Sequence, residues 1–411
     1  PIQTQLEDKV LRVAISGAAG RIGNALAPMI ASGFLFGDNQ SVSLRLLEEQ
    51  DAFQQLEGLK YQLEDSCLPL LHDIVATTNA EEAFDKADFV FELAGRPPII
   101  GESNTKFIED NIPIMYDHGK ALNLVAPPHV RVLVVSNPVN VNALVLAHFA
   151  SRIDPRQITG LVRNDHNRGL SWIASKADVA VSEIEKFCVW GNRSGTLFAD
   201  ITDTTVADKP IKQVVKNNAK RKFYVRSGAI NHVVRRSAYL KQWRPVEGTN
   251  GVVKAIFDHI HDWMHGTEER WVSMVVPSFG EYGIEKGLWS AYPVTCSNGN
   301  YHIVSDLQFD DFRRDFLEAS HNSLKSDSDV FLKLVYPTIG GTIKKLDWGV
   351  TWRNPTFKTI EKPKPKPPTE DVEKNKKAAA QKAAEERRAK LLERLRKQQE
   401  EESTPTSSVA L

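Results

Sequence analysis

The feature that most constrains the fold is a short apolar strand that runs directly into a glycine-rich turn. Residues 11–16 read Leu-Arg-Val-Ala-Ile-Ser, residues 17–23 follow as Gly-Ala-Ala-Gly-Arg-Ile-Gly, and a helix is expected to start near Arg21. Glycines at this spacing let the backbone approach a pyrophosphate, and the helix N-terminus supplies N–H groups and partial positive charge. The pattern predicts a dinucleotide-binding turn formed by Gly17, Gly20, Arg21, Ile22 and Gly23.

Strand and helix patterns alternate through the first part of the chain. Further strands are expected at residues 42–47, 88–94 and 130–135, with a helix at residues 104–110. Such alternation argues for a parallel sheet covered on both faces, and right-handed crossovers make it doubly wound. An acid at the end of the second strand, Glu48, strengthens the interpretation of the glycine turn.

From about residue 160 the pattern changes to longer helices mixed with strands that resemble hairpins. The expected helices cover residues 170–176, 251–261 and 310–321, and the expected strands cover residues 271–277, 292–298 and 301–304. These elements predict an α+β second domain, which the last helix closes.

Beyond about residue 335 the composition changes again. Trp348 and Trp352 make residues 336–360 too apolar for a solvated tail, so we expect this segment to lie against a surface. A Pro/Lys spacer at residues 362–368 leads to a charged helix at residues 371–402 and a disordered end. The chain therefore divides into domains at 1–159 and 160–335 and an extension at 336–411, whose helix is either an interaction device, including a weak coiled coil, or simply a solvated tail.

Composition excludes several classes of function. Lys and Arg number 52 and Asp and Glu also 52, so no overall charge favours nucleic acid or a membrane surface as a partner. The three cysteines, Cys67, Cys188 and Cys296, lack CxxC spacing and are expected to be free thiols in a reducing compartment, without a metal site. No apolar run approaches the roughly 18 residues of a membrane span, and the first residues lack the character of a signal peptide. A cytoplasmic location is expected.

Three further motifs follow the glycine turn in a fixed order. They are Ser-Asn-Pro-Val-Asn at residues 136–140, Asp-His-Asn-Arg at residues 165–168 and Val-Trp-Gly-Asn-Arg-Ser-Gly-Thr at residues 189–196. Together with the turn, they resemble the malate dehydrogenase family, in particular its cytosolic NAD-dependent type, over about residues 11–335. The resemblance implies a Rossmann NAD-binding domain followed by the α+β domain of lactate and malate dehydrogenases.

The resemblance also implies NAD as the cofactor. Glu48 stands where the family places an Asp that binds the adenosine ribose hydroxyls, and an acid there disfavours the 2′-phosphate of NADP. Asn137 matches an asparagine near the nicotinamide and the substrate. Without the resemblance, Glu48 reads as an exposed glutamate at a strand end and Asn137 as a turn residue. One strand also contains Glu92 among apolar residues, where an unpaired carboxylate would be costly.

The expected catalytic residues depart from the family. Asp165 and Arg168 match the acid that orients the catalytic histidine and one arginine that binds a substrate carboxylate, but Arg193 stands in place of that histidine. An arginine side chain keeps its proton and cannot act as the base, and loss of a positioned general base costs roughly 10²–10⁴-fold in rate. The resemblance implies that positions 193 and 165 face each other. Because an unpaired buried cation is unfavourable, we expect Arg193 to pair with Asp165 and thereby to block the substrate site. Alternatively, Arg168 and Arg193 bind a different anion.

The expected substrate loop departs from the family as well. The family pattern Pro-Arg-x-x-Gly-Met-x-Arg aligns with residues 97–104, so its two arginines become Pro98 and Asn104. Glu102 adds a negative charge that would repel a dicarboxylate, and Pro97 with Pro98 stiffens a loop that closes over substrate in the family. The serine-rich substrate helix has no clean counterpart in residues 235–251.

These observations favour a catalytically inactive dehydrogenase body that serves as a structural or scaffold component. A helix at residues 61–71 resembles the one with which active members dimerise, so a homodimer is expected, with protein partners bound through residues 336–402 and a place on a cytoskeletal or axonemal assembly. The alternative is an active NAD-dependent malate or 2-hydroxy acid dehydrogenase with altered specificity, whose base would be another histidine such as His232.

Overall fold

Six parallel strands form the sheet that positions the candidate site. The computed structural model describes residues 10–99, 101–214, 219–243 and 248–335. The parallel strands are β1 (Leu11–Ser16), β2 (Val42–Leu47), β3 (Leu71–Thr77), β4 (Phe89–Glu92), β5 (Arg131–Val134) and β6 (Ile158–Gly160). Their spatial order, β3-β2-β1-β4-β5-β6, reverses direction beside β1, so that β1 and β4 end on either side of the switch point at which such folds bind dinucleotides.

The second half of the chain extends the same sheet. β12 (Val272–Pro277) pairs with β6 in antiparallel direction, and β13 (Trp289–Ser297) and β14 (Asn300–Ile303) follow. In the described residues this gives one nine-stranded sheet shared by both halves. Smaller sheets are built from β7 (Ile184–Glu185), β8 (Cys188–Trp190), β9 (Phe198–Asp200), β10 (Thr205–Val206) and β11 (Lys209–Pro210).

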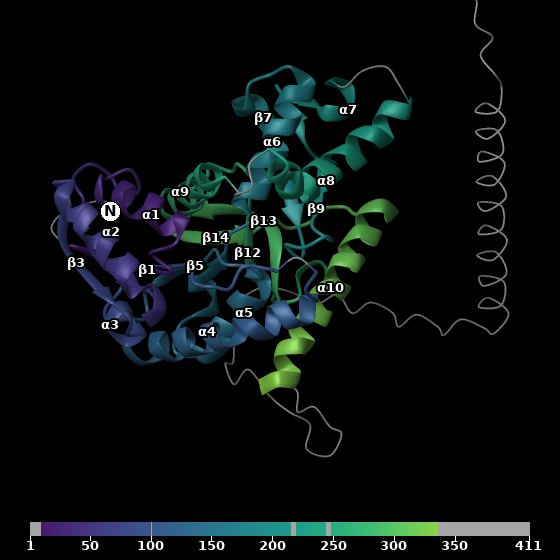
Figure 1. Cartoon of the computed structure of the whole chain (residues 1–411). Coiled ribbons are helices and arrows are strands. Elements are labelled where there is room, and N and C mark those ends of the chain that lie inside the picture. Colours follow the sequence, from purple (N-terminus) through teal and green to yellow (C-terminus); the bar gives the residue numbers. More distant parts are fainter. Residues whose placement is uncertain (1–9, 100, 215–218, 244–247, 336–411) are drawn as a thin grey trace, which may run out of the picture. The chain divides into compact units, whose positions relative to one another are not determined.

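Helices cover both faces of the large sheet. The helices of the described residues are α1 (Arg21–Ala31), α2 (Phe53–Asp65), α3 (Ala80–Phe84), α4 (Asn104–Val125), α5 (Val139–Phe149), α6 (Arg163–Ala177), α7 (Ile211–Val214), α8 (Ala219–Lys241), α9 (Thr249–His265) and α10 (Asp311–Val335), with short 3₁₀ turns at Gln50–Ala52, Pro155–Gln157, Val181–Glu183 and Glu281–Gly283. Helices α1 and α9 lie over one face, and α4 and α5 lie over the other (Figure 1). The predicted doubly wound sheet with an α+β second part is confirmed.

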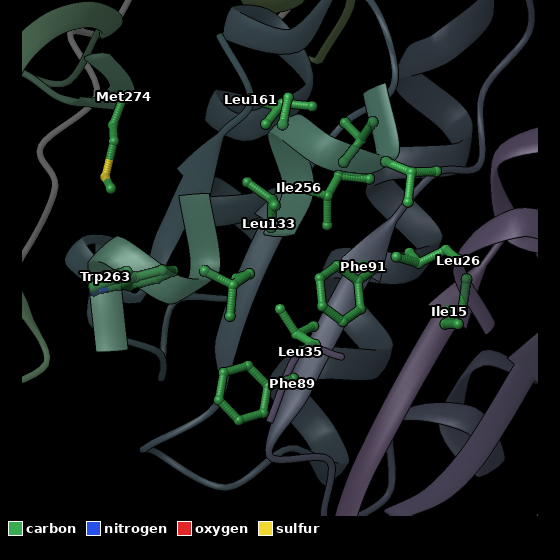
Figure 2. Packing of buried hydrophobic residues seen from close by; sticks show 14 of the residues in the cluster. Ile15, Leu26, Leu35, Phe89, Phe91, Leu133, Leu161, Ile256, Trp263 and Met274 are labelled. Atoms are coloured by element: carbon green, nitrogen blue, oxygen red, sulfur yellow. The ribbon is translucent and has the colours of Figure 1, made fainter. Parts of the chain in front are cut away.

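The core lies between the sheet and these helices. Because the central strands are covered on both faces, their side chains are apolar almost without alternation. Figure 2 shows strand residues and helix residues meeting in one buried cluster, among them Ile15, Phe91, Leu133, Leu26 and Ile256. Trp263 of α9 belongs to the same cluster, and the Arg131 guanidinium lies 5.7 Å from the centroid of its ring. This continuous packing fixes α9, and with it the second half, against the nucleotide-type sheet.

The helix expected over residues 61–71 is wrong in its second half. Helix α2 ends at Asp65, Cys67 adopts a φ of 48°, and strand β3 begins at Leu71. Pro69 explains the difference, because it disfavours helical backbone in the residue before it and cannot donate a helical hydrogen bond. In contrast, α4 and α10 continue well past their predicted ends. The predicted tryptophan segment, spacer and charged helix of residues 336–411 lie outside the described residues.

The glycine turn gives the first prediction. A Cβ at Gly23 would lie 2.2 Å from the backbone oxygen of Ala18, whereas a Cβ at Gly58 in α2 would meet no atom within 4 Å. We expect Gly23→Ala to lower the free energy of unfolding by about 1–3 kcal/mol through overpacking. Gly58→Ala serves as the matched control and should raise it by about 0.5–1 kcal/mol through helix propensity. Denaturant unfolding of both variants tests this, and an unchanged Gly23→Ala midpoint would contradict the close approach.

Candidate active site

The carboxylate of Glu48 lies against the backbone of the dinucleotide turn. The N–H of Ala19 donates to Glu48 Oε2 at 3.0 Å and the N–H of Glu49 donates to Glu48 Oε1 at 3.1 Å, so the carboxylate is oriented at the end of β2. Among the described residues no side chain caps the N-terminus of α1 at Gly20. The turn therefore keeps an open helix N-terminus for a pyrophosphate and an acid placed for ribose hydroxyls, which is the arrangement that a dinucleotide requires.

Glu92, which the sequence places in an apolar strand, is buried but has partners. His118 on α4 brings its Nδ1 within 3.0 Å of both carboxylate oxygens, and the Ser16 hydroxyl donates to Oε1. Burial alone would lower the pKa of His118, but the neighbouring Glu92 carboxylate outweighs it and raises the pKa above its ordinary value. The Ser16 hydroxyl also accepts the N–H groups of Leu93 and Ala94, so this network ties β1 to the chain that leaves β4.

Asp165 lies in the first turn of α6 and is bound by two arginines. Arg193 Nε donates to Oδ2 at 2.6 Å and Arg168 NH1 donates to Oδ1 at 2.7 Å. The Asp165 side chain is only 6% exposed, while those of Arg193 and Arg168 are 17% and 20% exposed. The expected ion pair between Arg193 and Asp165 is thus present. Both carboxylate oxygens are engaged by arginines, which leaves the site with two cations and one anion.

A short motif holds Arg193 in place. Trp190 is buried in the core, and Gly191 has a φ of 87° and lies so close to α10 that a Cβ would meet Ser320 Oγ at 1.9 Å. The N–H of Asn192 donates to the same Ser320 hydroxyl at 2.7 Å. Only glycine combines this left-handed backbone with this contact, so the motif positions the next residue, Arg193, to reach Asp165.

Two asparagines complete the surroundings of Arg193. Its backbone N–H donates to Asn140 Oδ1 at 2.9 Å, and its guanidinium donates to Asn137 Oδ1. Asn140 is fixed in turn by the carbonyl of Trp289, 2.8 Å from its Nδ2. The side chain of Asn137, predicted to lie near a nicotinamide, therefore contacts Arg193, which the resemblance aligns with the catalytic histidine.

The loop that follows β4 has internal ion pairs. Arg96 NH2 lies 2.6 Å from Glu102 Oε1 and 3.0 Å from Asp110 Oδ2. The Arg96 guanidinium lowers the pKa of Glu102, so the expected repulsive charge of Glu102 is compensated within the loop itself. Pro98, which the resemblance aligns with a substrate-binding arginine, is exposed.

Asn104, aligned with the second missing arginine, begins α4 and contacts α10 instead of the cleft. Its Nδ2 donates to Asp327 Oδ1 at 2.8 Å, and Asn192 Nδ2 donates to Asp327 Oδ2 at 2.7 Å. Burial raises the pKa of Asp327, a cost that these two donors reduce. This contact could not be predicted from local patterns, because Asp327 lies more than 200 positions from Asn104.

Two histidines lie near Asp165 in the sequence or on the helix packed against α6, and of these His232 was the expected candidate for a substitute base. His166 is fully buried with Nδ1 2.9 Å from Ser273 Oγ, and burial lowers its pKa well below the ordinary value. The His232 ring lies against Trp172, with 6.2 Å between ring centroids. Within the described ranges neither histidine contacts Asp165, whose carboxylate oxygens are occupied by arginines.

The described residues contain neither a metal cluster nor a helix that could span a membrane. Within the described ranges no cluster of three or more His, Cys, Asp or Glu side chains is arranged to hold a metal ion. No helix of those ranges is both long and apolar enough to span a membrane. The three cysteines are free thiols, with Cys67 exposed and Cys188 and Cys296 buried.

A dinucleotide turn at the switch point of a Rossmann sheet, with an Asp–Arg pair in the adjoining α+β part, defines the architecture of an NAD-dependent 2-hydroxy acid dehydrogenase. Family models agree: lactate/malate dehydrogenase, NAD binding domain, matches residues 11–160, and lactate/malate dehydrogenase, alpha/beta C-terminal domain, matches residues 163–334. The chain belongs to the lactate/malate dehydrogenase family.

Relatives of known name support the same assignment. The chain is 38% identical over 330 residues to malate dehydrogenase 3, cytoplasmic, of Arabidopsis thaliana, covering 79% of this chain and 96% of that protein. The crystal structure of malate dehydrogenase from Naegleria fowleri is similar at 35% identity and a TM-score of 0.74, over 78% of this chain and 98% of that one. Trichomonas vaginalis lactate dehydrogenase in complex with NADH and oxamate is similar at 30% identity and a TM-score of 0.75, over 79% and 99%.

The buried pair of His118 and Glu92 gives a pH-dependent prediction. Because the folded state raises the pKa of His118, its stabilisation is complete below the ordinary pKa near 6.5 and is lost as the pH rises through the higher folded value. We expect His118→Gln to cost about 3 kcal/mol of unfolding free energy at about pH 6 and clearly less at about pH 9.

Denaturant unfolding at the two pH values measures this difference. His129→Gln is the matched control, because His129 also approaches a carboxylate, that of Asp88 at 3.2 Å, but its side chain is 63% exposed. Its effect should stay below about 1 kcal/mol at both pH values. A His118→Gln penalty that grows with pH would show that the imidazole is not protonated in the fold.

Proposed function

We propose that this protein is a catalytically inactive member of its family, which keeps the dehydrogenase body as a structural or scaffold component. The observation that carries the proposal is the Arg193–Asp165 contact at 2.6 Å. Hydride transfer from a 2-hydroxy acid needs a group that accepts the hydroxyl proton, and a guanidinium does not accept protons near neutral pH. Arg193 occupies the place of that base.

The surroundings of the cleft support the proposal. Both oxygens of the Asp165 carboxylate already accept hydrogen bonds from arginines, Arg193 on one and Arg168 on the other. The loop positions that carry arginines in active relatives hold Pro98 and Asn104, and Asn104 contacts Asp327. A dicarboxylate would therefore find fewer cations on the loop, and a cation already paired where the reacting centre should lie.

The NAD-type site is proposed to be retained. Gly17, Gly20 and Gly23 with the open N-terminus of α1 would hold the pyrophosphate, and Glu48 would bind the ribose hydroxyls. The cofactor supplies hydride chemistry when bound, but here we propose a structural role for it. Binding to the folded state alone would stabilise the body by mass action.

The proposed structural role includes assembly. A homodimer is proposed through helix α2, on which Tyr61 is exposed. Partner proteins are proposed to bind residues 336–402, in which Trp348 and Trp352 supply the kind of aromatic anchors found at interfaces. A cytoplasmic location on a cytoskeletal or axonemal assembly follows as the setting for such a component.

The test of inactivity is NADH oxidation with oxaloacetate at high protein concentration, beside an active malate dehydrogenase. We expect a rate more than about a hundredfold below that of the active enzyme, because the base is absent. Arg193→His should raise the rate, since Asp165 can then orient an imidazole, while leaving it below the active enzyme because Pro98 and Asn104 remain. Wild-type turnover within about a hundredfold would overturn the proposal and favour an enzyme of altered specificity with a substitute base.

Cofactor retention is tested separately by titrating NADH and following its fluorescence. Glu48→Ala should weaken NADH binding roughly tenfold, because the ribose hydroxyls lose a charged acceptor. Glu49→Ala is the matched control, since Glu49 is an adjacent exposed acid but the turn amide of Ala19 donates to Glu48, so its removal should leave the affinity unchanged. Equal affinities for the two variants, or a preference for NADPH, would contradict the proposed role of Glu48.

A further inference from the structure

A pocket separate from the cleft lies where helix α6 packs against α8. Its volume is about 380 Å³, and its walls include Trp172 and Lys176 from α6 and His232, Arg235, Arg236 and Tyr239 from α8. Neither Asp165 nor Arg193 contributes to it. The volume falls within the range of small-molecule sites. The pocket is independent of whether the protein turns over a 2-hydroxy acid.

The charged residues that line this pocket are all cations. Lys176, Arg235 and Arg236 make no ion pair within the described residues, although many other arginines of the chain do. Burial together with Arg236, Arg168 and Lys176 lowers the pKa of His232, in keeping with cations that approach it from both helices. In a chain with equal numbers of acids and bases, such an excess of one sign around a cavity favours an anionic ligand.

The pocket residues of α6 extend a row of side chains that begins at Arg168. Arg168, Trp172 and Lys176 are spaced four residues apart on α6, so they stand on one face of the helix. Arg168 is the same residue that binds Asp165. Eight residues of helix correspond to about 12 Å, which is long enough for a chain of phosphates. The arginine fork and the lysine ammonium are the side chains that proteins use for phosphate oxygens.

Aromatic rings from both helices line the same pocket. The Trp172 and His232 rings are tilted by 35° to each other, and the Arg236 guanidinium lies 5.3 Å from the centroid of the Tyr239 ring. Gly228 makes room for the indole, because a Cβ there would lie 3.0 Å from Trp172 Cζ2. Trp172 is thus held against the backbone of α8 while it remains partly exposed to the pocket. A flat, partly exposed indole next to arginines suits a planar ring.

We propose that this pocket binds a nucleoside phosphate. The base would stack on Trp172, and the phosphate oxygens would be bound by Lys176 and the two arginines of α8. The site lies outside the dinucleotide turn, so the protein would carry two nucleotide sites of different chemistry: one reads a pyrophosphate with backbone N–H groups, and the other uses side-chain cations.

The experiment is a calorimetric titration of the full chain with ATP, and with tripolyphosphate as the probe that lacks a ring. Arg235→Glu combined with Arg236→Glu should weaken ATP binding about tenfold or more, because charge-assisted hydrogen bonds are lost and repulsion is added. Trp172→Leu should weaken it roughly tenfold through lost stacking. The matched control combines Lys286→Glu with Lys333→Glu, which changes the charge equally at exposed lysines elsewhere and should leave the affinity unchanged.

Glu48→Ala separates the pocket from the dinucleotide turn. ATP binding that survives Glu48→Ala but not the double arginine variant supports the proposal. ATP binding that is lost in Glu48→Ala, or is unaffected by the arginine changes, would place ATP at the turn and overturn it. Equal affinity for tripolyphosphate and ATP would overturn the part played by the ring, and absence of ATP binding would overturn the whole.

A second measurement does not depend on variants that must fold. Photolabelling of the wild-type chain with 8-azido-ATP, followed by peptide mapping, should mark peptides from α6 and α8. Labelling confined to α1 and β2 would overturn the proposal, because it would place ATP at the dinucleotide turn. Excess NADH should reduce labelling at the turn and leave labelling of the pocket in place.

Discussion

The arrangement of the candidate active site follows from one buried carboxylate, that of Asp165, which requires cations beside it. Asp165 is almost fully withdrawn from water, and a carboxylate in that position is stable only beside cations or strong donors. Arg168 binds one oxygen and Arg193 the other. The turn at Gly191 and the hydroxyl of Ser320 hold the backbone so that Arg193 reaches the carboxylate. The identity of residue 193 therefore decides both the local charge balance and the chemistry that the cleft can perform.

Much of the fold, and less of the candidate site, could be predicted from local sequence. The doubly wound sheet was predicted from the first strand, the glycine turn and the alternation of strands and helices that follows. These signals are local, because hydrophobic periodicity and turn residues are properties of neighbouring positions. The Arg193–Asp165 pair could be predicted only through the family resemblance, in which these two positions face each other, because 28 positions separate them in the sequence. The partner of Glu92 could not: His118 lies 26 positions further on, and only the packing of α4 on the sheet brings it near. Asn104 and Asp327 are still further apart, and no periodicity links them.

The loop after β4 shows how one residue has different meanings in sequence and in structure. Glu102 reads as a charge that would repel an anionic substrate, but Arg96 lies six positions away and neutralises it. Asp110 accepts from the same guanidinium, so the loop is joined to the first turns of α4. Asn104 then joins the start of α4 to α10 through Asp327. These contacts restrict a segment that closes over substrate in active relatives, which agrees with the proposed loss of activity.

The ion pairs of Asp165 also have a consequence for how function is inferred from sequences. Removing Asp165 would leave two cations close together without their shared counterion, a costly change in any chain that must stay folded. On the proposed loss of activity, selection for stability alone would retain Asp165 and Arg168 of the Asp-His-Asn-Arg motif after selection for catalysis had ended. A survey that counts this motif as proof of a working dehydrogenase would then overcount enzymes, whereas the residue after Trp-Gly-Asn would separate the two groups.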